Sequence, residues 1–327
     1  MNVINLSFIR TPNGMFWYAV DKIRSLGIDL ESHVVVVKPG LESLVQRELP
    51  SAHVLARSRI RFIQDIFQWL VLYGRQVRLV TFTPHPIPFF RRQTIAFYDD
   101  YPFRGRFGWA KRLLFALAAK SSGCRVGIIN RSVAIPFLER CGVAPDRIFF
   151  DTAFPAVEIA KLPVRSRETG PVPVVGLVGT DSEKKNYDAI FDAVASLQLT
   201  GELRFLIYGG ENRYVESLRR NHRAVHFEIV PSDEVDIPVF LNSVDYLVSA
   251  ATAEGYGRPM GLAVVMGVPL FLLRAPVFLE FFGEHALFFD NVPEMMTFIV
   301  KSKPPATALL PDATMGATLR SPFFVQD

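Results

Sequence analysis

The residues best suited to chemistry lie in one glycine-rich segment, Ala253-Glu254-Gly255-Tyr256-Gly257-Arg258-Pro259-Met260-Gly261. It follows the apolar run Tyr246–Ser249 and opens a helical pattern, with Pro259 suited to the first helical turn. Glycines let backbone N–H groups at a helix start approach a diphosphate, and a carboxylate such as Glu254 accepts hydrogen bonds from sugar hydroxyls. The segment therefore predicts a binding site, with a purely structural loop as the alternative.

A second candidate follows the first apolar run of the second half, in Gly179-Thr180-Asp181-Ser182-Glu183-Lys184-Lys185-Asn186. Lys184 and Lys185 stand at the start of a predicted helix, where the helix dipole disfavours a cation unless an anion is bound. A phosphate beside them is the functional interpretation, and a solvated lysine pair is the alternative. Gly209-Gly210 follows the next apolar run, where a tight turn explains it equally well.

The first half offers weaker candidates. Gly14 directly precedes a helical pattern, so it opens either an anion site or a plain strand-to-helix turn. The segment Pro84–Arg112 interleaves aromatic and basic residues, including Arg91, Arg92, Arg104, Arg106 and Trp109. This mixture suits an anionic membrane interface, but it also suits stacking on single-stranded nucleic acid, or a core with a basic rim.

These segments must be positioned by a framework of strands and helices. Apolar runs alternating with helical patterns indicate βα units on parallel sheets. In the second half we predict strands and intervening helices as follows: strands Val174–Val178, Leu203–Tyr208, Val225–Val230, Tyr246–Ser249, Pro269–Leu273 and Ala286–Phe289; helices Asn186–Leu197, Asn212–Asn221, Ile237–Ser243 and Arg258–Met266.

The first half follows the same rule, with predicted strands Val3–Phe8, His33–Val37, His53–Ala56, Arg78–Phe82, Thr94–Tyr98, Arg125–Ile129 and Arg147–Phe150, and helices Met15–Ser25, Leu41–Glu48, Ile60–Tyr73, Trp109–Lys120 and Ala134–Arg140. The predicted fold is α/β: two doubly wound, Rossmann-like domains facing across a cleft. We place them at residues 1–160 and 174–302, with a proline-rich linker at 161–173. The tail, 303–327, is expected to be irregular and could pack back on the first domain.

Composition excludes several classes. The chain has 327 residues, 50% of them hydrophobic and 21% charged, which favours a large core over disorder. No apolar run reaches the roughly 18 residues of a membrane span, and the N-terminus does not resemble a secretory signal. The two cysteines cannot form a disulfide framework, and six scattered histidines predict no structural metal.

Charge divides the chain unequally. Through Arg165 there are 23 Lys and Arg against 12 Asp and Glu, and beyond it 13 against 20. The basic first half suits an anionic partner, although scattered solvated arginines with no partner would give the same count.

The second half resembles a known family. The runs GTDSEKKN, YGG, VDYLVSAATAEGYGRPMGLAVVMGVP and EFFGEHALFF resemble the nucleotide-sugar half of GT-B glycosyltransferases, most closely the retaining family-4 group. The resemblance covers most of Val174–Asp290 and is fainter in SFIRTPNGMFWYAVDKI and INRSVAIPFLERCGVAPDRIFF of the first half.

The match is incomplete at individual residues. Lys185 falls on the family's diphosphate-binding lysine and Glu254 on the glutamate that contacts the donor sugar. Thr180 stands where an arginine is usual, and Leu262 replaces the glutamate that usually holds the ribose. Tyr98-Asp99 stands where His-Asp is common, so Asp99 is carried over without the histidine.

The resemblance implies transfer of a sugar from a nucleoside-diphosphate donor to a hydroxyl of a saccharide or lipid-linked saccharide, in bacterial cell-surface polysaccharide or lipopolysaccharide assembly. It implies retention of anomeric configuration and no obligatory metal or cofactor. We expect a cytoplasmic protein, peripheral at the inner face of the cell membrane. Two alternatives stay open: a non-catalytic scaffold of the same fold, and a single-stranded nucleic-acid binder using the basic half.

Overall fold

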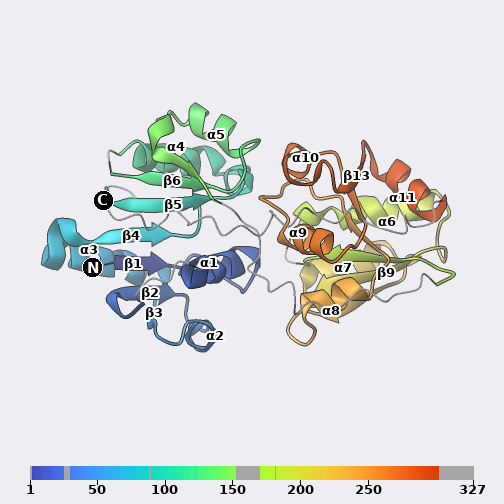
Figure 1. Ribbon diagram of the computed structural model, residues 1–327, viewed down its shortest axis with the longest axis horizontal. Coiled ribbons are helices and arrows are strands. Elements are labelled where there is room, and N and C mark those ends of the chain that lie inside the picture. Colours follow the sequence, from blue (N-terminus) through green and yellow to red (C-terminus); the bar gives the residue numbers. More distant parts are fainter. Residues whose placement is uncertain are drawn as a thin grey trace. The chain divides into compact units, whose positions relative to one another are not determined.

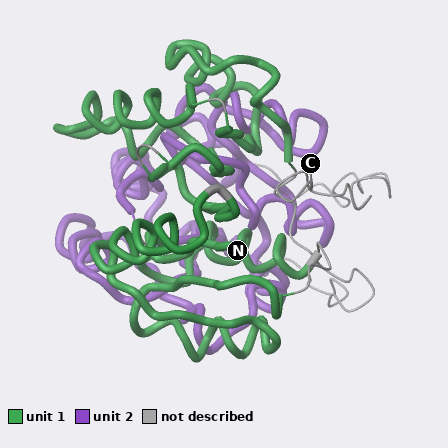
Figure 2. Tube along the Cα trace, turned by 90° about the vertical axis from the view of Figure 1, so that its left-hand side faces the viewer, with its two compact units in different colours: residues 1–156, 318–327 green, residues 157–317 purple. Residues whose placement is uncertain are grey.

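A computed structural model describes residues 2–25, 30–87, 90–121, 123–151, 170–180 and 182–301. The described residues form two compact units, unit 1 (residues 2–151) and unit 2 (residues 170–301), which Figure 2 colours separately. Most of the predicted linker (161–173) and all of the predicted tail (303–327) lie outside the described residues.

Unit 1 is a seven-stranded parallel sheet in the order β3-β2-β1-β4-β5-β6-β7 (Figure 1). Its strands are β1 (Asn2–Asn5), β2 (His33–Val37), β3 (His53–Ala56), β4 (Arg78–Thr81), β5 (Gln93–Phe97), β6 (Arg125–Ile128) and β7 (Ile148–Phe150). Its helices are α1 (Gly14–Ser25), α2 (Glu42–Glu48), α3 (Arg59–Tyr73), α4 (Gly108–Ala119) and α5 (Ala134–Arg140), with short 3-10 turns that include η3 (Tyr101–Phe103).

Unit 2 is a six-stranded parallel sheet in the order β10-β9-β8-β11-β12-β13 (Figure 1). Its strands are β8 (Val174–Val178), β9 (Arg204–Gly209), β10 (Phe227–Pro231), β11 (Tyr246–Ser249), β12 (Leu270–Leu273) and β13 (Ala286–Phe289). Its helices are η6 (Glu183–Lys185), α6 (Tyr187–Ser196), α7 (Arg213–Asn221), α8 (Ile237–Asn242), α9 (Arg258–Val265), α10 (Pro276–Phe282) and α11 (Val292–Lys301).

Both sheets reverse their strand order beside the first strand of the unit. In unit 1 the chain adds β2 and β3 on one side of β1, then β4 on the other, and in unit 2 β8 and β11 have the same relation. Ligands of such sheets bind beyond the carboxyl ends of the strands at this switch point. In unit 2 the β8–β11 pairing holds only Tyr246 against Val175 and Leu247 against Gly176, so the two strands lose their pairing before their carboxyl ends.

The predicted α/β class with two doubly wound parallel sheets is confirmed. The first strand is shorter than the predicted Val3–Phe8, because after Asn5 the Ile9 N–H donates to the Leu6 carbonyl (3.0 Å) and closes a turn. Helices α10 and α11 were not predicted. Among the described residues, no helix is long and apolar enough to span a bilayer.

The strands are apolar along their length because helices cover the sheets. Helices cover the sheets, so residues such as Val35, Val36 and Val37 of β2 are completely buried. In unit 1 the rings of Phe97 and Phe137 pack with their centroids 4.8 Å apart, between β5 and α5. This rigid packing fixes the strand ends and the loops that follow them.

Candidate functional site

Two residues predicted from separate segments meet at the switch point of unit 2. Lys185 lies in the loop after β8 and Glu254 in the loop after β11. The Lys185 Nζ donates to Glu254 Oε2 at 3.0 Å, and the side chains are 14% and 16% exposed. A mostly buried ion pair therefore links the loops on either side of the position where a ligand is expected.

The charge of Glu254 follows from its neighbours. Burial alone would raise the pKa of this carboxyl, but the positive charges of Lys185 and Lys184 oppose burial, together with hydrogen bonds from Lys185 and the Gly255 N–H. The net result is a pKa below the usual glutamate value. Glu254 is thus a carboxylate at neutral pH, able to accept hydrogen bonds but not to act as a general acid.

The glycines of the β11–α9 loop have distinct structural reasons. Gly257 has φ +88°, a left-handed conformation that other residues rarely adopt, and a Cβ there would lie 3.0 Å from Met260 Sδ. A Cβ at Gly261 would lie 2.8 Å from the hydroxyl of Tyr256, whose buried ring packs edge-on against Phe281. Helix α9 begins at Arg258 with Pro259 in its first turn, and the N–H groups of Met260 and Gly261 already donate to the Gly257 carbonyl.

Thr180, which stands where the family usually has an arginine, has a structural role. It is buried, and its hydroxyl donates to the Gly210 carbonyl (2.8 Å) and accepts the Gly210 N–H (3.0 Å). A Cβ on Gly209 would come within 2.6 Å of this hydroxyl, so glycine is needed there. Gly179, at φ +96°, makes the turn that brings Thr180 into place.

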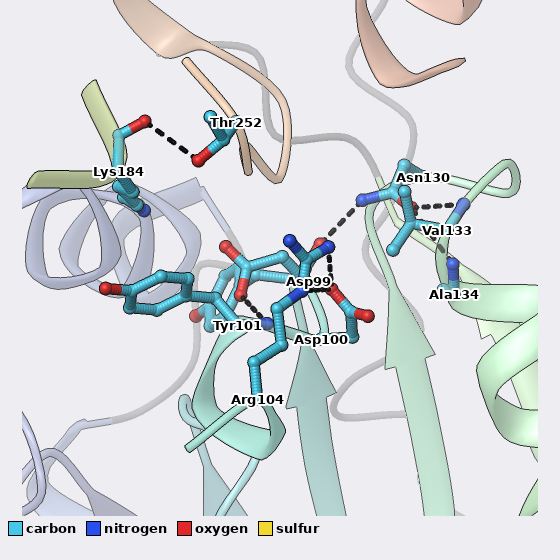
Figure 3. Close-up of polar contacts among 10 residues, drawn as sticks. Asp99, Asp100, Tyr101, Arg104, Asn130, Val133, Ala134, Lys184 and Thr252 are labelled. Carbon is cyan, nitrogen blue, oxygen red and sulfur yellow. Dashed lines mark hydrogen bonds and ion pairs between the residues drawn. The ribbon is translucent and has the colours of Figure 1, made fainter. Parts of the chain in front are cut away.

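Several residues that the sequence analysis did not select hold these loops together. Asn212 caps α7 and donates from Nδ2 to the Thr180 carbonyl (2.7 Å). The Tyr187 hydroxyl donates to the Gly179 carbonyl (2.7 Å), and the Tyr187 N–H donates to the Tyr214 hydroxyl (3.1 Å). Thr252 donates from its backbone N–H (2.9 Å) and hydroxyl (3.3 Å) to the Lys184 carbonyl; Figure 3 shows this pair. The sequence signal for this role was Asn212 itself, because asparagine is favoured at the N-cap of a helix.

Leu262, which replaces the usual ribose-binding glutamate, lies in α9 and is 4% exposed. It packs as an apolar helix residue and offers no hydrogen-bond acceptor. A nucleotide bound in unit 2 would therefore need another partner for its ribose hydroxyls.

In unit 1, Asp99 lies at the carboxyl end of β5. Its Oδ1 accepts the Tyr101 N–H at 3.1 Å and so shapes the turn into η3, while Asp100 pairs with Arg104 at 2.6 Å (Figure 3). Asn130 follows β6, donates to the Tyr98 carbonyl (2.6 Å) and accepts the N–H groups at the start of α5.

Gly14 opens α1 at the carboxyl edge of the unit 1 sheet, and Asn13 accepts the Met15 and Phe16 N–H groups there (3.1 and 3.3 Å). A Cβ on Gly14 would meet nothing within 4 Å. Packing therefore does not require glycine at this helix start.

The predicted aromatic and basic segment divides between core and surface. Phe97 and Phe103 form part of the core, whereas Phe107 and Trp109 are 65% and 71% exposed. Arg91 and Arg92 are exposed, Arg104 pairs with Asp100, and the Arg106 guanidinium lies 5.7 Å from the Phe107 ring. Helix α4 continues this surface with exposed leucines at positions 113, 114 and 117.

Three comparisons with known proteins bear on this arrangement. Residues 172–301 match the family model of glycosyl transferases group 1. A sequence search of curated proteins finds no significant match. A structure search finds a sucrose-phosphate synthase from Thermosynechococcus elongatus, with 12% identity and a TM-score of 0.63, covering 92% of this chain and 90% of that one. It also finds a glycosyltransferase from Rickettsia africae ESF-5, with 13% identity and a TM-score of 0.62, covering 91% of this chain and 88% of that one.

S. aureus TarM is also similar, at 14% identity and a TM-score of 0.53 over 72% of this chain. The present chain spans about half the length of TarM, 50% of that structure. At these identities the structural likeness establishes the fold alone, and the family model covers residues 172–301 of the 327.

The parallel sheets and the structural neighbours give the chain the GT-B fold, and within it residues 172–301 match glycosyl transferases group 1. Its unit 2 is the part that the family model recognises.

Proposed function

We propose that the protein transfers a sugar from a nucleoside-diphosphate donor, held by unit 2, to a hydroxyl of a saccharide or lipid-linked saccharide held by unit 1. The Lys185–Glu254 pair at the switch point of unit 2 carries this proposal. It combines a cation for a diphosphate with a carboxylate for sugar hydroxyls in one place.

In the proposed chemistry the bond from the anomeric carbon to the diphosphate breaks, and negative charge develops on the leaving diphosphate. The acceptor oxygen bonds to the anomeric carbon, and its hydroxyl proton passes to the departing diphosphate. Lys185 and Lys184, together with backbone amides near Gly257, would stabilise this charge. Glu254, released from part of its ion pair, would orient the sugar. Asp99 is the proposed carboxylate on the acceptor side. The resemblance to the family implies no obligatory metal, and we keep that expectation.

A role in bacterial surface glycan assembly is supported by structural neighbours. The TarM structure is a complex with UDP and alpha-GlcNAc-glycerol, and WaaB is a lipopolysaccharide outer core galactosyltransferase (12% identity, TM-score 0.53, covering 91% of this chain and 88% of that one). We therefore favour a polysaccharide or lipopolysaccharide acceptor.

The acceptor side suggests a membrane. Exposed Phe107 and Trp109 lie beside Arg104 and Arg106 on unit 1, as expected of a surface that inserts rings among headgroups and faces anionic lipid with cations. We propose peripheral attachment to the inner face of the cell membrane, with the protein otherwise in the cytoplasm.

The competing proposal is a non-catalytic binding subunit, favoured by Thr180 and Leu262, both of which depart from the family's donor contacts. Calorimetric titration with nucleoside diphosphates and with the matching nucleotide sugars separates the two. We expect at least one pair to bind and the nucleotide sugar to be consumed slowly in the presence of protein. Binding of none of them would favour the scaffold.

A further inference from the structure

A second cluster of side chains lies at the switch point of unit 1. Phe8 and Arg10 follow β1, and Thr83 and His85 follow β4. These two strands pair along their whole length, Asn2–Asn5 against Arg78–Thr81, and the strand order reverses between them. The cluster therefore occupies the position in unit 1 that Lys185 and Glu254 occupy in unit 2.

Two buried polar atoms in this cluster have no hydrogen-bond partner among the residues that the structure describes. They are Nδ1 of His85 and Oγ1 of Thr83, and Thr83 is only 1% exposed. Leaving a buried donor or acceptor unsatisfied costs about 1–3 kcal/mol, so such groups are rare and need a reason. A ligand that supplies the missing partners is one such reason.

Two further cationic side chains come from the first turns of α3 and α4. The guanidinium of Arg59, the first residue of α3, lies 5.2 Å from the Phe8 ring centroid, and its Nη2 donates to the Phe8 carbonyl at 3.3 Å. The Phe8 ring lies 5.7 Å from the His85 ring. Lys111, in the first turn of α4, donates to the Pro102 carbonyl at 3.1 Å.

The described residues do not balance these positive charges with an ion pair. Within the part of the chain that the structure describes, Arg10, Arg59 and Lys111 form no ion pair. The pKa of Arg59 is lowered mainly by burial and to a smaller extent by the charge of Arg10. The pKa of His85 is lowered to about 4, mainly by burial and further by the charges of Arg59 and Lys111. Like charges gathered without a counter-charge favour an anion between them.

We infer that this cluster of Phe8, Arg10, Arg59, Thr83, His85 and Lys111 binds a phosphate group of the acceptor. That the phosphate belongs to the acceptor rests on the proposed function. A phosphate offers several acceptor oxygens at once, which matches the guanidinium of Arg59, the ammonium of Lys111, the Thr83 hydroxyl and a ring N–H of His85.

The helices that carry the two cations suggest where the phosphate comes from. Both α3 and α4 expose apolar side chains, among them Phe67 and Val71 of α3 and Trp109 and Leu113 of α4. A phosphate attached to a lipid chain would satisfy the cluster and these apolar surfaces together. The experiment below distinguishes this source from a phosphate without a chain.

The test uses the His85 ring as a local reporter. The full chain is labelled in its six histidines, and His85→Gln assigns the His85 signals in the NMR spectrum. On titration with inorganic phosphate we expect these signals to shift and saturate, and the pKa of His85 to rise from about 4, because the bound anion stabilises the imidazolium. Arg59→Gln and Lys111→Gln should each weaken phosphate binding tenfold or more.

The matched control is Arg61→Gln. Arg61 is an exposed arginine on the same helix whose guanidinium donates to Gln64 Oε1 at 3.4 Å, and its loss should leave phosphate binding unchanged. A soluble short-chain alkyl phosphate that binds more tightly than inorganic phosphate indicates a lipid-linked source, and equal binding indicates a phosphate without a chain. No shift at His85, or equal weakening by the Arg61 variant, overturns the inference.

This outcome is separable from that of the proposed function. Binding of nucleoside diphosphates should persist in Arg59→Gln, because Lys185 is in the other unit. If His85 responds to phosphate but no nucleotide binds, the phosphate site stands and the donor proposal fails. If nucleotides bind but His85 does not respond, the reverse holds.

Discussion

The two units build the same sheet edge with different charges. Each reverses its strand order beside its first strand, and each places side chains from two loops at that point. In unit 2 the cation Lys185 is matched by Glu254 at 3.0 Å, whereas in unit 1 Arg59 and Lys111 lie near a neutral histidine with no carboxylate paired to them among the described residues. Topology thus sets where we expect a ligand in each unit, and local charge sets which kind of ligand we propose there.

The charge balance of the sequence follows the same division. Positive residues outnumber negative ones 23 to 12 through Arg165, and negative residues outnumber positive ones 20 to 13 beyond it. A balanced site suits a ligand with both a diphosphate and neutral hydroxyls, because each end of the ion pair gains a partner. An unbalanced basic site suits an anion. Variants in one unit should therefore affect one ligand and spare the other.

The largest expected effect is on membrane binding by unit 1. Neutralising Arg91, Arg92, Arg104 and Arg106 together to Gln should lower co-sedimentation with anionic liposomes, at roughly 1 kcal/mol per cation near the surface. Arg104 should contribute least, since Asp100 already pairs with it.

Donor binding by unit 2 should be unchanged in this fourfold variant. That measurement is the control that unit 2 of the variant is still folded. A wild-type protein that stays in the supernatant with anionic liposomes at low salt would contradict the membrane proposal.

The next effect is on the donor. Lys185→Ala removes a charge-assisted contact to the diphosphate, worth on the order of 1.5–3 kcal/mol, and leaves Glu254 without its 3.0 Å partner. We expect weaker binding of the nucleoside diphosphate by calorimetry and slower transfer.

Lys301→Ala, at the end of α11, is the control for loss of a lysine in unit 2. Unchanged affinity together with unchanged turnover in Lys185→Ala would remove this lysine from the donor site.

A smaller effect is expected at Glu254. The substitution Glu254→Gln keeps the shape and removes the charge, so turnover should fall about tenfold or more, which is about 1.4 kcal/mol in the barrier. Leu262→Glu is a paired test: Leu262 is buried, so a glutamate there should destabilise unit 2 rather than restore a ribose contact. Full transfer by a folded Glu254→Gln protein would argue for the scaffold alternative.

The sequence predicted the framework better than the site. The bounds of β8, β11 and β13 agree with the prediction. A short apolar run between turn residues is typical of a strand in a parallel sheet whose faces are covered by helices. Helix α11 was missed although Asn291 accepts the Glu294 N–H at 2.9 Å, a capping pattern that was readable. The selection of Lys185 and Glu254 came from their local positions in two loops.

Their pairing was beyond the sequence, because it depends on strand order bringing residues 69 positions apart to one edge. Thr180 shows another limit: the sequence marked it as standing where the family usually has an arginine, and only the structure shows that its hydroxyl bonds to Gly210. The sequence analysis counted His85 only as one of six scattered histidines. Its neighbours come from the loop after β1 and from α3 and α4, and nothing in the local sequence indicates this.

The smallest expected effect is the acid response of the Glu254 ion pair. The pKa of Glu254 is lower in the folded protein than the ordinary value of about 4.3 in an unfolded chain. The unfolded state therefore binds more protons in this range, so the pair stabilises the fold above pH ~4.3 and the contribution is lost as the pH falls through the folded pKa. Urea unfolding of the wild type and of Glu254→Gln, followed from neutral pH to below pH ~4, measures this difference. The wild type should be the more stable protein at neutral pH, and the gap between the two should close only in the acid range. A gap that does not change with pH would show that Glu254 gains no stability from Lys185, and the balanced charge that separates unit 2 from unit 1 would then lack an energetic basis.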